Sequence, residues 1–256
     1  MAEQNFLGKI AVVTGAGRGL GLGIARGFGE AGANVVVAEK DVERGRHAVK
    51  ALIKEGINAA FEPLDVSIPQ QSVELVKRIV ATFGRLDVWV NSAGMAHITP
   101  AESMAIEKWD ESIAVLLSGT FYCSQAAGRQ MLAQGRGVIV NLASVNAFKA
   151  IEERAAYCTA KAGIVMLTQA LGVEWAERGV RVVAIAPGPV ETDMVKELFV
   201  QGKASADLYK RRTPLHRLGT LQDVVDATLF LASDHASFIT AETLRVDGGW
   251  VAYQMF

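Results

Sequence analysis

The sequence predicts an α/β fold, built as a doubly wound parallel sheet with helices on both faces. Three observations support this prediction. Short β-branched runs alternate with longer segments of helical periodicity, and the runs are apolar on successive residues, as in strands covered on both sides. A glycine-rich turn joins the first run to the first helical segment. With 256 residues, 50% of them hydrophobic, the chain can bury one large core.

The expected elements follow one another in order. Strands are predicted at residues 10–14, 34–38, 86–90, 137–141 and 180–185. Helices are predicted at residues 19–31, 42–55, 70–83, 106–132, 155–178 and 221–232. Strand alternating with helix gives right-handed crossover units and hence a Rossmann-like sheet. Because no linker or repeat interrupts the pattern, residues 1–256 are expected to form a single dinucleotide-binding catalytic domain.

Composition narrows the classes of partner. A net charge of -1 without a basic run disfavours nucleic acid or an anionic membrane, and a small ligand fits better. No apolar stretch approaches the ~20 residues that cross a bilayer. Two cysteines, Cys123 and Cys158, and a polar N-terminus predict a cytoplasmic protein. No His, Cys and carboxylate cluster suggests a metal site.

Residues 188–217 interrupt the rhythm with nearby prolines, several charges and irregular apolar positions. They follow the carboxyl end of an expected strand, where open α/β sheets bind ligands. A substrate lid is therefore expected here, and a helical surface excursion is the alternative interpretation.

A glycine-rich segment from Thr14 to Gly21 leaves the first strand and enters a helix. Glycines let the backbone approach a pyrophosphate, and the helix N-terminus offers unpaired N–H groups. Because the strand ends at Thr14, we take Gly15, Gly19 and Gly21 as the functional set. The extra glycines Gly17 and Gly23 leave that register open.

Glu39 ends the second strand, where an acidic residue can bind the adenosine ribose hydroxyls. A ribose 2′-phosphate ~5 Å from this carboxylate would be repelled by roughly 3 kcal/mol per unit charge at an effective dielectric of ~20. NAD is therefore the expected cofactor. NADP stays possible because Lys40 and Arg18 could reach the phosphate, although both could also be solvated surface charges.

Tyr157 and Lys161 are four residues apart in a predicted helix, so their side chains share one face. An ammonium ~5 Å away would lower the pKa of the phenol by roughly two units and make it a proton carrier near neutrality. Ser144 follows the strand at 137–141, at the same sheet edge as the glycine loop, and could hold a substrate oxygen. Taken alone, a Tyr-x-x-x-Lys pair is usually ordinary helix surface.

With these residues in place, the sequence resembles the short-chain dehydrogenase/reductase family over nearly its whole length. The matching motifs are Thr14–Gly21, Leu64–Val66, Asn91–Gly94, Ser144, Tyr157–Lys161, Pro187–Gly188 with Thr192, and Val246–Gly249. The resemblance implies Ser144, Tyr157 and Lys161 as catalytic residues. The implied cofactor contacts are Gly15, Arg18, Gly19, Leu20, Gly21, Glu39, Asp65, Val66, Asn91, Ala93, Gly94, Tyr157, Lys161, Pro187, Gly188, Val190 and Thr192.

Individual roles follow from the same resemblance. Asp65 would bind the adenine amine, and Asn91 to Gly94 would line the adenosine side. Lys161 would hold the nicotinamide ribose, while Pro187, Val190 and Thr192 would contact the nicotinamide. Asn91 could also simply stabilise the turn that ends its strand.

Two further implications concern assembly and proton supply. The helices from Ile106 and Ala155 resemble those that form a four-helix interface, which implies a homotetramer, although their apolar faces could be intramolecular core. Most members carry an Asn three residues before the position of Gly119, where it links the lysine to solvent through a water molecule. This chain has Leu116 there, which predicts a slowed or rerouted proton step.

The predicted activity is hydride transfer between a nicotinamide cofactor and a secondary alcohol or ketone. Asn146 and His97, the candidate substrate contacts, and nearby Glu152 favour a sugar or polyol substrate. A ketoacyl thioester is the main alternative, supported by the basic residues Lys149, Arg154, Lys203 and Lys210–Arg212. A hypothesis from another class is a catalytically weak dinucleotide-binding sensor or scaffold.

Overall fold

One parallel sheet organises the molecule. The computed structural model describes residues 6–191 and 205–254. Its strands are β1 (Ile10–Thr14), β2 (Asn34–Glu39), β3 (Ala59–Pro63), β4 (Val88–Asn91), β5 (Gly137–Leu142), β6 (Val180–Pro187) and β7 (Thr243–Val246). They lie in the order β3-β2-β1-β4-β5-β6-β7, all parallel. The order reverses between β1 and β4, which is where such sheets bind ligands.

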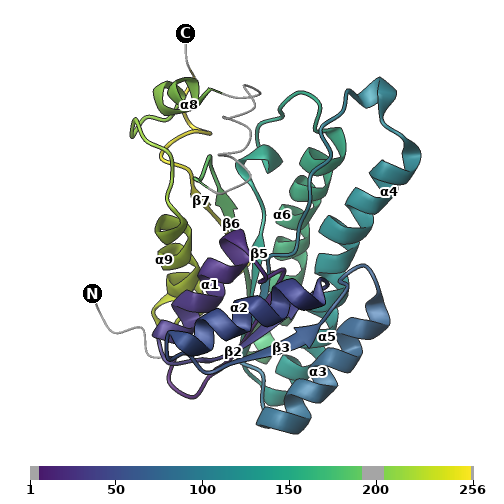
Figure 1. Cartoon of the computed structure of the whole chain (residues 1–256), viewed down its shortest axis with the longest axis vertical. Coiled ribbons are helices and arrows are strands. Elements are labelled where there is room, and N and C mark those ends of the chain that lie inside the picture. The colour runs from purple at the N-terminus through teal and green to yellow at the C-terminus, as the bar shows by residue number, and fades with distance from the viewer. Residues whose placement is uncertain (1–5, 192–204, 255–256) are drawn as a thin grey trace.

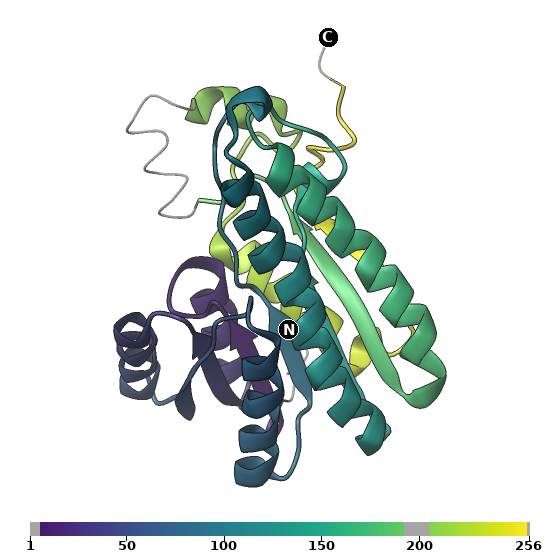
Figure 2. The same cartoon turned by 90° about the vertical axis from the view of Figure 1, so that its right-hand side faces the viewer.

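Helices cover both faces of the sheet, as predicted. Their bounds are α1 (Gly19–Glu30), α2 (Val42–Lys54), α3 (Pro69–Phe83), α4 (Ile106–Ile113), α5 (Gly119–Gln134), α6 (Ala155–Trp175), α8 (Ala206–Arg212) and α9 (Leu221–Ala232). One apolar core joins α1, α2 and α9 to the sheet, and a second joins α3, α5 and α6. Figure 1 shows α1 and α2 in front of β2 and β3, and Figure 2 shows the same layers turned by 90°.

Strand β1 shows why the strands are apolar on successive residues. Ala11 and Val13 belong to the first core, whereas Ile10 and Val12 belong to the second. Successive side chains of a strand point to opposite faces, so a strand buried on both sides needs apolar residues throughout.

Two strands were not predicted, and both are edge strands. β3 and β7 occupy the two ends of the sheet. β3 has no fully buried residue, and the middle of β7, Leu244 and Arg245, is exposed. Half-exposed edges do not need continuous apolar runs, so the pattern that identified the central strands is missing there.

The predicted helix at 106–132 is α4 followed by α5, with a π-helical turn (Ala114–Ser118) between them. Single π-turns widen a helix locally and frequently occur at functional sites. Leu116, the position that departs from the family pattern, lies in this turn and is buried.

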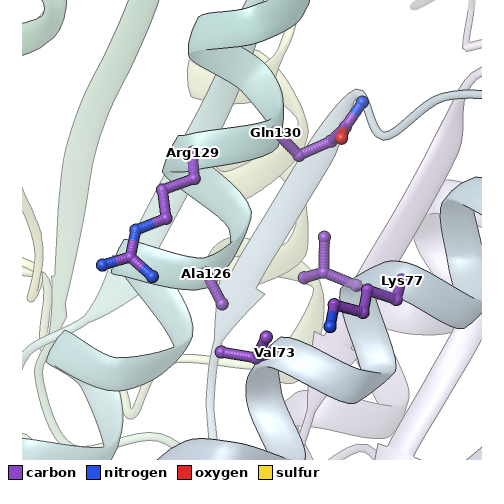
Figure 3. Close-up of a pocket in the computed structure, with 6 residues that line it drawn as sticks. Val73, Lys77, Ala126, Arg129 and Gln130 are labelled. Carbon is purple, nitrogen blue, oxygen red and sulfur yellow. The ribbon is translucent and has the colours of Figure 1, made fainter.

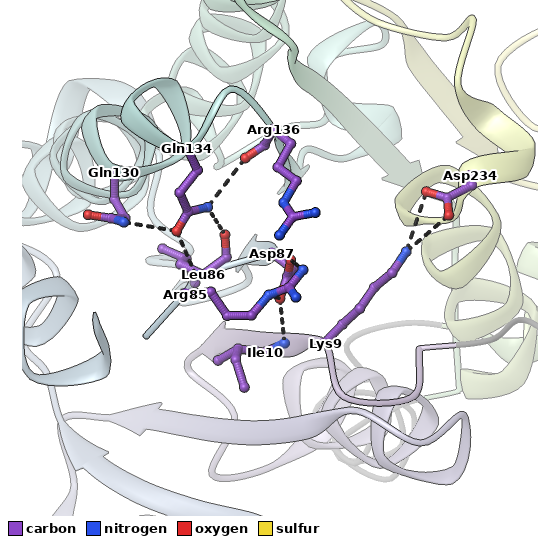
Figure 4. A network of polar contacts seen from close by, with 9 residues as sticks. All are labelled: Lys9, Ile10, Arg85, Leu86, Asp87, Gln130, Gln134, Arg136 and Asp234. Atoms are coloured by element: carbon purple, nitrogen blue, oxygen red, sulfur yellow. Dashed lines mark hydrogen bonds and ion pairs between the residues drawn. The ribbon is translucent and has the colours of Figure 1, made fainter. Parts of the chain in front are cut away.

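The opposite edge of the sheet, where the strands begin, is held by polar contacts (Figure 4). The Asp87 carboxylate accepts a hydrogen bond from the Ile10 amide (2.9 Å) and pairs with Arg85. Gln134, the last residue of α5, accepts from the Leu86 amide (3.0 Å) and donates to the Leu86 carbonyl (2.8 Å). These contacts fix β1, β4 and α5 to one another and leave the carboxyl edge free for ligands.

Among the residues that the structure describes, no helix is long and apolar enough to cross a membrane. The expected lid at 188–217 is described only in part, because residues 192–204, which include Thr192 and Lys203, lie outside the described ranges.

Candidate active site

The glycine loop adopts a conformation that requires glycine. Gly15 has φ +63° and Gly19 has φ +59°, in the left-handed region that favours glycine. A Cβ on Gly15 would lie 2.6 Å from the Ala93 Cα, so the loop packs directly against the turn after β4. The Thr14 hydroxyl oxygen accepts hydrogen bonds from the Ser92 and Ala93 amides, both at 3.1 Å. The two segments expected on the adenosine side therefore form one wall.

The N-terminus of α1 suits an anion. Its first turn contains no acidic residue, and the N-cap Arg18 makes no side-chain capping hydrogen bond. A Cβ on Gly19 would meet no atom within 4 Å, so the backbone there faces open space. Unpaired N–H groups beside an open backbone fit a cofactor diphosphate, with Gly19, Leu20 and Gly21 in position to hold it.

Glu39 is directed at this loop. Its buried carboxylate accepts hydrogen bonds from the amides of Gly17 (3.2 Å) and Asp41 (3.1 Å). Sequence reasoning missed Arg44, whose Nη1 lies 3.7 Å from Glu39 Oε1 and whose Nη2 lies 2.8 Å from Asp41 Oδ2. The available signal was Asp41, which caps α2 by accepting from the Arg44 amide. Glu39 is thus held in place for ribose hydroxyls, with a cation beside it.

Lys40, one of two residues expected to offset repulsion of a 2′-phosphate, instead pairs with Asp65 at 2.7 Å. Asp65 Oδ1 also accepts from the Ser67 amide (3.0 Å) and hydroxyl (2.6 Å). Burial opposes ionisation of Asp65, but the bonds from Lys40 and Ser67 outweigh it and hold the pKa of Asp65 below its usual value. Asp65 is therefore an ionised acceptor. Next to it, Val66 packs against Gly119.

The Asn91 side chain is fully used inside the protein. It accepts from the Trp89 indole (2.8 Å) and donates to Ser124 (2.9 Å) and Asn141 (2.8 Å). Asn91 and Asn141 are also register partners on β4 and β5. Of its two expected roles, the structure therefore places the side chain in strand stabilisation and leaves only its backbone for a cofactor.

Ser144, Tyr157 and Lys161 come from adjoining elements. Ser144 caps a short 3₁₀ turn (Val145–Ala147) after β5, and its oxygen accepts from the Asn146 amide at 3.1 Å. Tyr157 lies in the first turn of α6, and Lys161 follows one turn later. The 3₁₀ turn packs against α6, and Ser144 lies near enough to Tyr157 to act on the pKa of its phenol. The structure therefore places these three residues on adjoining elements, and their catalytic roles stay a prediction.

The expected effect of Lys161 on Tyr157 is wrong for this structure. Burial raises the pKa of Tyr157, while the Ser144 hydrogen bond and the Arg154 charge oppose the rise. The Lys161 ammonium donates to the Leu142 carbonyl and lies 5.7 Å from the Tyr157 ring centre. Burial lowers the pKa of Lys161 itself to about 8. Desolvation therefore sets the direction of the pKa shift of both groups. The Lys161 ammonium is oriented by the backbone carbonyl of Leu142.

The carboxyl end of β6 supplies Pro187, Gly188 and Val190. The Gly188 amide donates to the Val246 carbonyl at 2.9 Å, and a Cβ there would lie 2.8 Å from the Asp247 Cα. Val190 is buried and bridges to Gly219. These contacts place all three residues where the chain leaves the carboxyl end of β6, at the same edge of the sheet as Ser144.

The described part of the expected lid rests on the C-terminal loop. The Tyr209 ring stacks on Trp250 with centroids 5.3 Å apart, and the Arg212 guanidinium lies 4.3 Å from the Trp250 centroid. In Figure 1, α8 lies at one end of the molecule, beyond β6 and β7.

The two candidate substrate contacts differ in their surroundings. Asn146 is next but one to Ser144 and is half-buried. His97 Nε2 lies 3.1 Å from Glu111 Oε2, which also pairs with Lys108 at 2.9 Å. The His97 ring is therefore engaged by α4, whereas Asn146 remains next to the catalytic serine.

A shallow groove lies elsewhere, between α3 and α5. Val73, Val76, Lys77, Ala126, Arg129 and Gln130 line it. Figure 3 shows Val73 and Lys77 on α3 and Ala126, Arg129 and Gln130 on α5. It contains none of the catalytic or cofactor candidates.

Comparisons with known proteins find relatives over nearly the whole chain. The family model described as "Enoyl-(Acyl carrier protein) reductase" matches residues 15–251. The 3beta-hydroxysteroid dehydrogenase 1 of Eggerthella lenta is 40% identical over 99% of this chain and 97% of its own. The D-threitol dehydrogenase of Mycolicibacterium smegmatis is 37% identical over 95% and 93%. A gluconate 5-dehydrogenase from Burkholderia cenocepacia, solved with NADP and tartrate, is 33% identical, covers 98% of both chains and has a TM-score of 0.93.

Proposed function

Because the chain belongs to the short-chain dehydrogenase/reductase family, we propose that Ser144, Tyr157 and Lys161 oxidise a secondary alcohol of a small polyhydroxy substrate, with NAD as the preferred cofactor. The chain is an NAD(P)-dependent oxidoreductase that acts on CH–OH groups. The observation that carries the residue assignment is the meeting of Ser144 and Tyr157 at the carboxyl edge of the sheet, beside the glycine loop.

The protein's own groups have distinct tasks. The Ser144 hydroxyl holds the substrate oxygen, and the Tyr157 phenolate takes the hydroxyl proton as the carbon becomes a carbonyl. A bound nicotinamide supplies the hydride acceptor. Lys161, whose ammonium donates to the Leu142 carbonyl, would bind the nicotinamide ribose.

NAD preference rests on Glu39. Its carboxylate would repel a 2′-phosphate ~5 Å away by roughly 3 kcal/mol per unit charge at an effective dielectric of ~20. Arg44 lies beside Glu39 and weakens that repulsion, so use of NADP at lower efficiency is included in the proposal. The preference for NAD favours alcohol oxidation as the direction in the cell.

A polyol or sugar derivative is the proposed substrate class. Support comes from Asn146 beside Ser144 and from relatives named for D-threitol and gluconate. The second candidate is a ketoacyl thioester, which the acyl-carrier name of the family model favours. The basic turn of α8, Lys210 to Arg212, would suit its acidic carrier.

We also propose one catalytic domain over residues 1–256, with residues 188–217 as its lid, acting as a cytoplasmic homotetramer. Apolar side chains exposed on α5 and α6 support assembly, namely Phe121, Met166 and Val173. Both cysteines are free, which fits a reducing compartment. Mass measurement in solution tests the tetramer.

The central experiment compares wild type with Tyr157→Phe on polyols, sugars and ketoacyl esters, with NAD and NADP. We expect turnover to fall by at least about 100-fold while NAD still quenches tryptophan fluorescence. Tyr122→Phe, the same change on α5, is the control and should leave turnover unchanged. Equal rates in wild type and Tyr157→Phe would remove Tyr157 from its role. Cofactor binding without turnover of any substrate would favour the sensor hypothesis.

A further inference from the structure

Arg154 lies three residues before the catalytic Tyr157 and has a guanidinium nitrogen without a hydrogen-bond partner. Its Nε atom is buried and makes no hydrogen bond, and within residues 6–191 and 205–254 no ion pair involves it. Other arginines of the molecule pair with carboxylates, among them Arg26 with Glu55, Arg85 with Asp87 and Arg217 with Asp223. Burying a guanidinium nitrogen without a hydrogen-bond acceptor destabilises the folded protein. The unpaired Nε of Arg154 therefore points to an acceptor that a bound ligand would supply.

Its position is fixed by two elements. Arg154 is the residue before α6 begins, so Tyr157 lies one turn further along the same face. The Glu153 carbonyl accepts from the Thr99 amide at 2.9 Å, which ties down the loop before Arg154. On the facing side, the 3₁₀ turn carrying Asn146 packs against α6.

The neighbourhood of Tyr157 confirms that the charge is close. The Arg154 charge acts on the phenol and favours its ionised form, against the larger effect of burial. The carboxylates nearest in sequence, Glu152 and Glu153, are exposed, and in the described part of the chain neither forms an ion pair with Arg154. The guanidinium is therefore not neutralised by its own loop.

We propose that Arg154, together with the Asn146 side chain, binds an anionic oxygen group of the substrate, a carboxylate or a phosphate, a few bonds from the carbon that is oxidised. This inference rests on the proposed function and narrows its substrate class to hydroxy acids or phosphorylated polyols. The planar guanidinium offers paired N–H donors that match such groups, and the amide of Asn146 adds a donor from the Ser144 side.

The test uses matched pairs of compounds that differ in one charged group. Gluconate is compared with sorbitol, glycerate with glycerol, and glycerol phosphate serves as the phosphate arm. For wild type we expect the anionic member of a pair to have the higher kcat/KM. In Arg154→Gln that value should fall roughly 10- to 150-fold, mainly through KM, because a charged hydrogen bond is lost. The neutral member should change less than about threefold.

Two further variants make the outcome specific. Arg154→Lys keeps the charge but loses the planar fork, so it should recover part of the preference and also shows whether the site tolerates substitution. Arg129→Gln is the same change in the groove between α3 and α5 and should leave the preference intact. A preference for gluconate and glycerate assigns a carboxylate, and a preference for glycerol phosphate assigns a phosphate.

A binding measurement separates this inference from the proposed function. Gluconate and glycerol phosphate are titrated against Tyr157→Phe and against Tyr157→Phe with Arg154→Gln, both with NAD, using tryptophan fluorescence. Weaker anion binding in the double variant supports the site even where no turnover occurs. The inference is overturned if Arg154→Gln changes anionic and neutral compounds equally, if wild type prefers the neutral members, or if neither anion binds.

Discussion

The Lys161 ammonium donates a hydrogen bond to the main-chain carbonyl of Leu142, the last residue of β5. This contact connects the helix that carries Tyr157 to the strand that leads to Ser144. It also keeps a lysine in a place that is 6% exposed, where burial lowers its pKa from 10.5 to about 8. The buried ammonium of Lys161 therefore lowers the free energy of unfolding of the protein.

The first prediction concerns that cost. Between pH 8 and 10.5 the unfolded chain holds the Lys161 proton more tightly than the folded chain, so the free energy of unfolding of wild type rises with pH in this window. Below pH 8 the full penalty is present. Lys161→Met should therefore abolish turnover yet stabilise the fold at pH 7 by about 2 kcal/mol, after subtracting the lost bond to Leu142.

Urea unfolding of both proteins at pH 7 and above pH 10 measures this difference. The stability advantage of Lys161→Met should shrink as pH rises. A variant that is less stable than wild type at pH 7, or a difference that does not depend on pH, would contradict this account of the lysine.

The second prediction concerns Ser144 and the pH profile of oxidation. Oxidation needs Tyr157 as phenolate, so the rate rises as pH increases through the pKa of Tyr157. Burial raises this pKa, and the Ser144 hydrogen bond opposes the rise. Ser144→Ala should therefore move the rising limb to higher pH and lower kcat by about 100-fold, whereas Ser144→Thr keeps the hydroxyl and should restore part of both. Steady-state rates across pH measure the limb, and an unmoved limb in Ser144→Ala would refute the coupling.

The central sheet could be predicted from sequence because each of its strands must be apolar on both faces. β1, for example, alternates Val12 and Val13 between two cores. The edge strands β3 and β7 lack that requirement and escaped prediction. The glycine loop was recognisable because a close approach to Ala93 excludes any side chain at Gly15.

The sequence pattern proposes Ser144, Tyr157 and Lys161 as a group but does not give their electrostatics. Spacing places Tyr157 and Lys161 on one helix face, yet spacing says nothing of the Leu142 carbonyl that takes the ammonium. Arg44 was missed as a site group for a related reason, and Arg154 was considered only as one of several basic residues that would favour a ketoacyl thioester. The partner of a charge, or its absence, depends on segments distant in sequence, such as the glycine loop for Glu39.

The third prediction concerns cofactor choice. Glu39→Gln removes the charge that repels a 2′-phosphate and keeps an acceptor for one of the two amides, of Gly17 and Asp41, that donate to the two carboxylate oxygens. The ratio of kcat/KM for NAD to that for NADP should fall roughly 100-fold, the equivalent of ~3 kcal/mol. Arg44→Gln removes the neighbouring cation and should shift the ratio the other way. Initial rates with both cofactors measure it, and equal ratios in all three proteins would rule out control by Glu39.

The last prediction concerns Leu116, where the resemblance to the family leads us to expect an Asn. The Leu116 side chain packs beside Gly94, since its Cδ2 lies 3.4 Å from where a Cβ on Gly94 would be. Its carbonyl accepts a hydrogen bond from the Thr120 hydroxyl at 2.6 Å. An apolar side chain and an already engaged carbonyl both disfavour a water molecule that would relay protons to Lys161.

Leu116→Asn should therefore raise turnover severalfold and reduce the solvent deuterium isotope effect on kcat, because proton exchange with solvent no longer limits the rate. It should also lower stability by about 1–3 kcal/mol, since an amide replaces a side chain that is 1% exposed. Leu116→Ala is the matched control, because it opens the same space without an amide. If turnover and isotope effect are unchanged in Leu116→Asn while Leu116→Ala loses comparable stability, protons reach Tyr157 by a path that never depended on this turn of the helix.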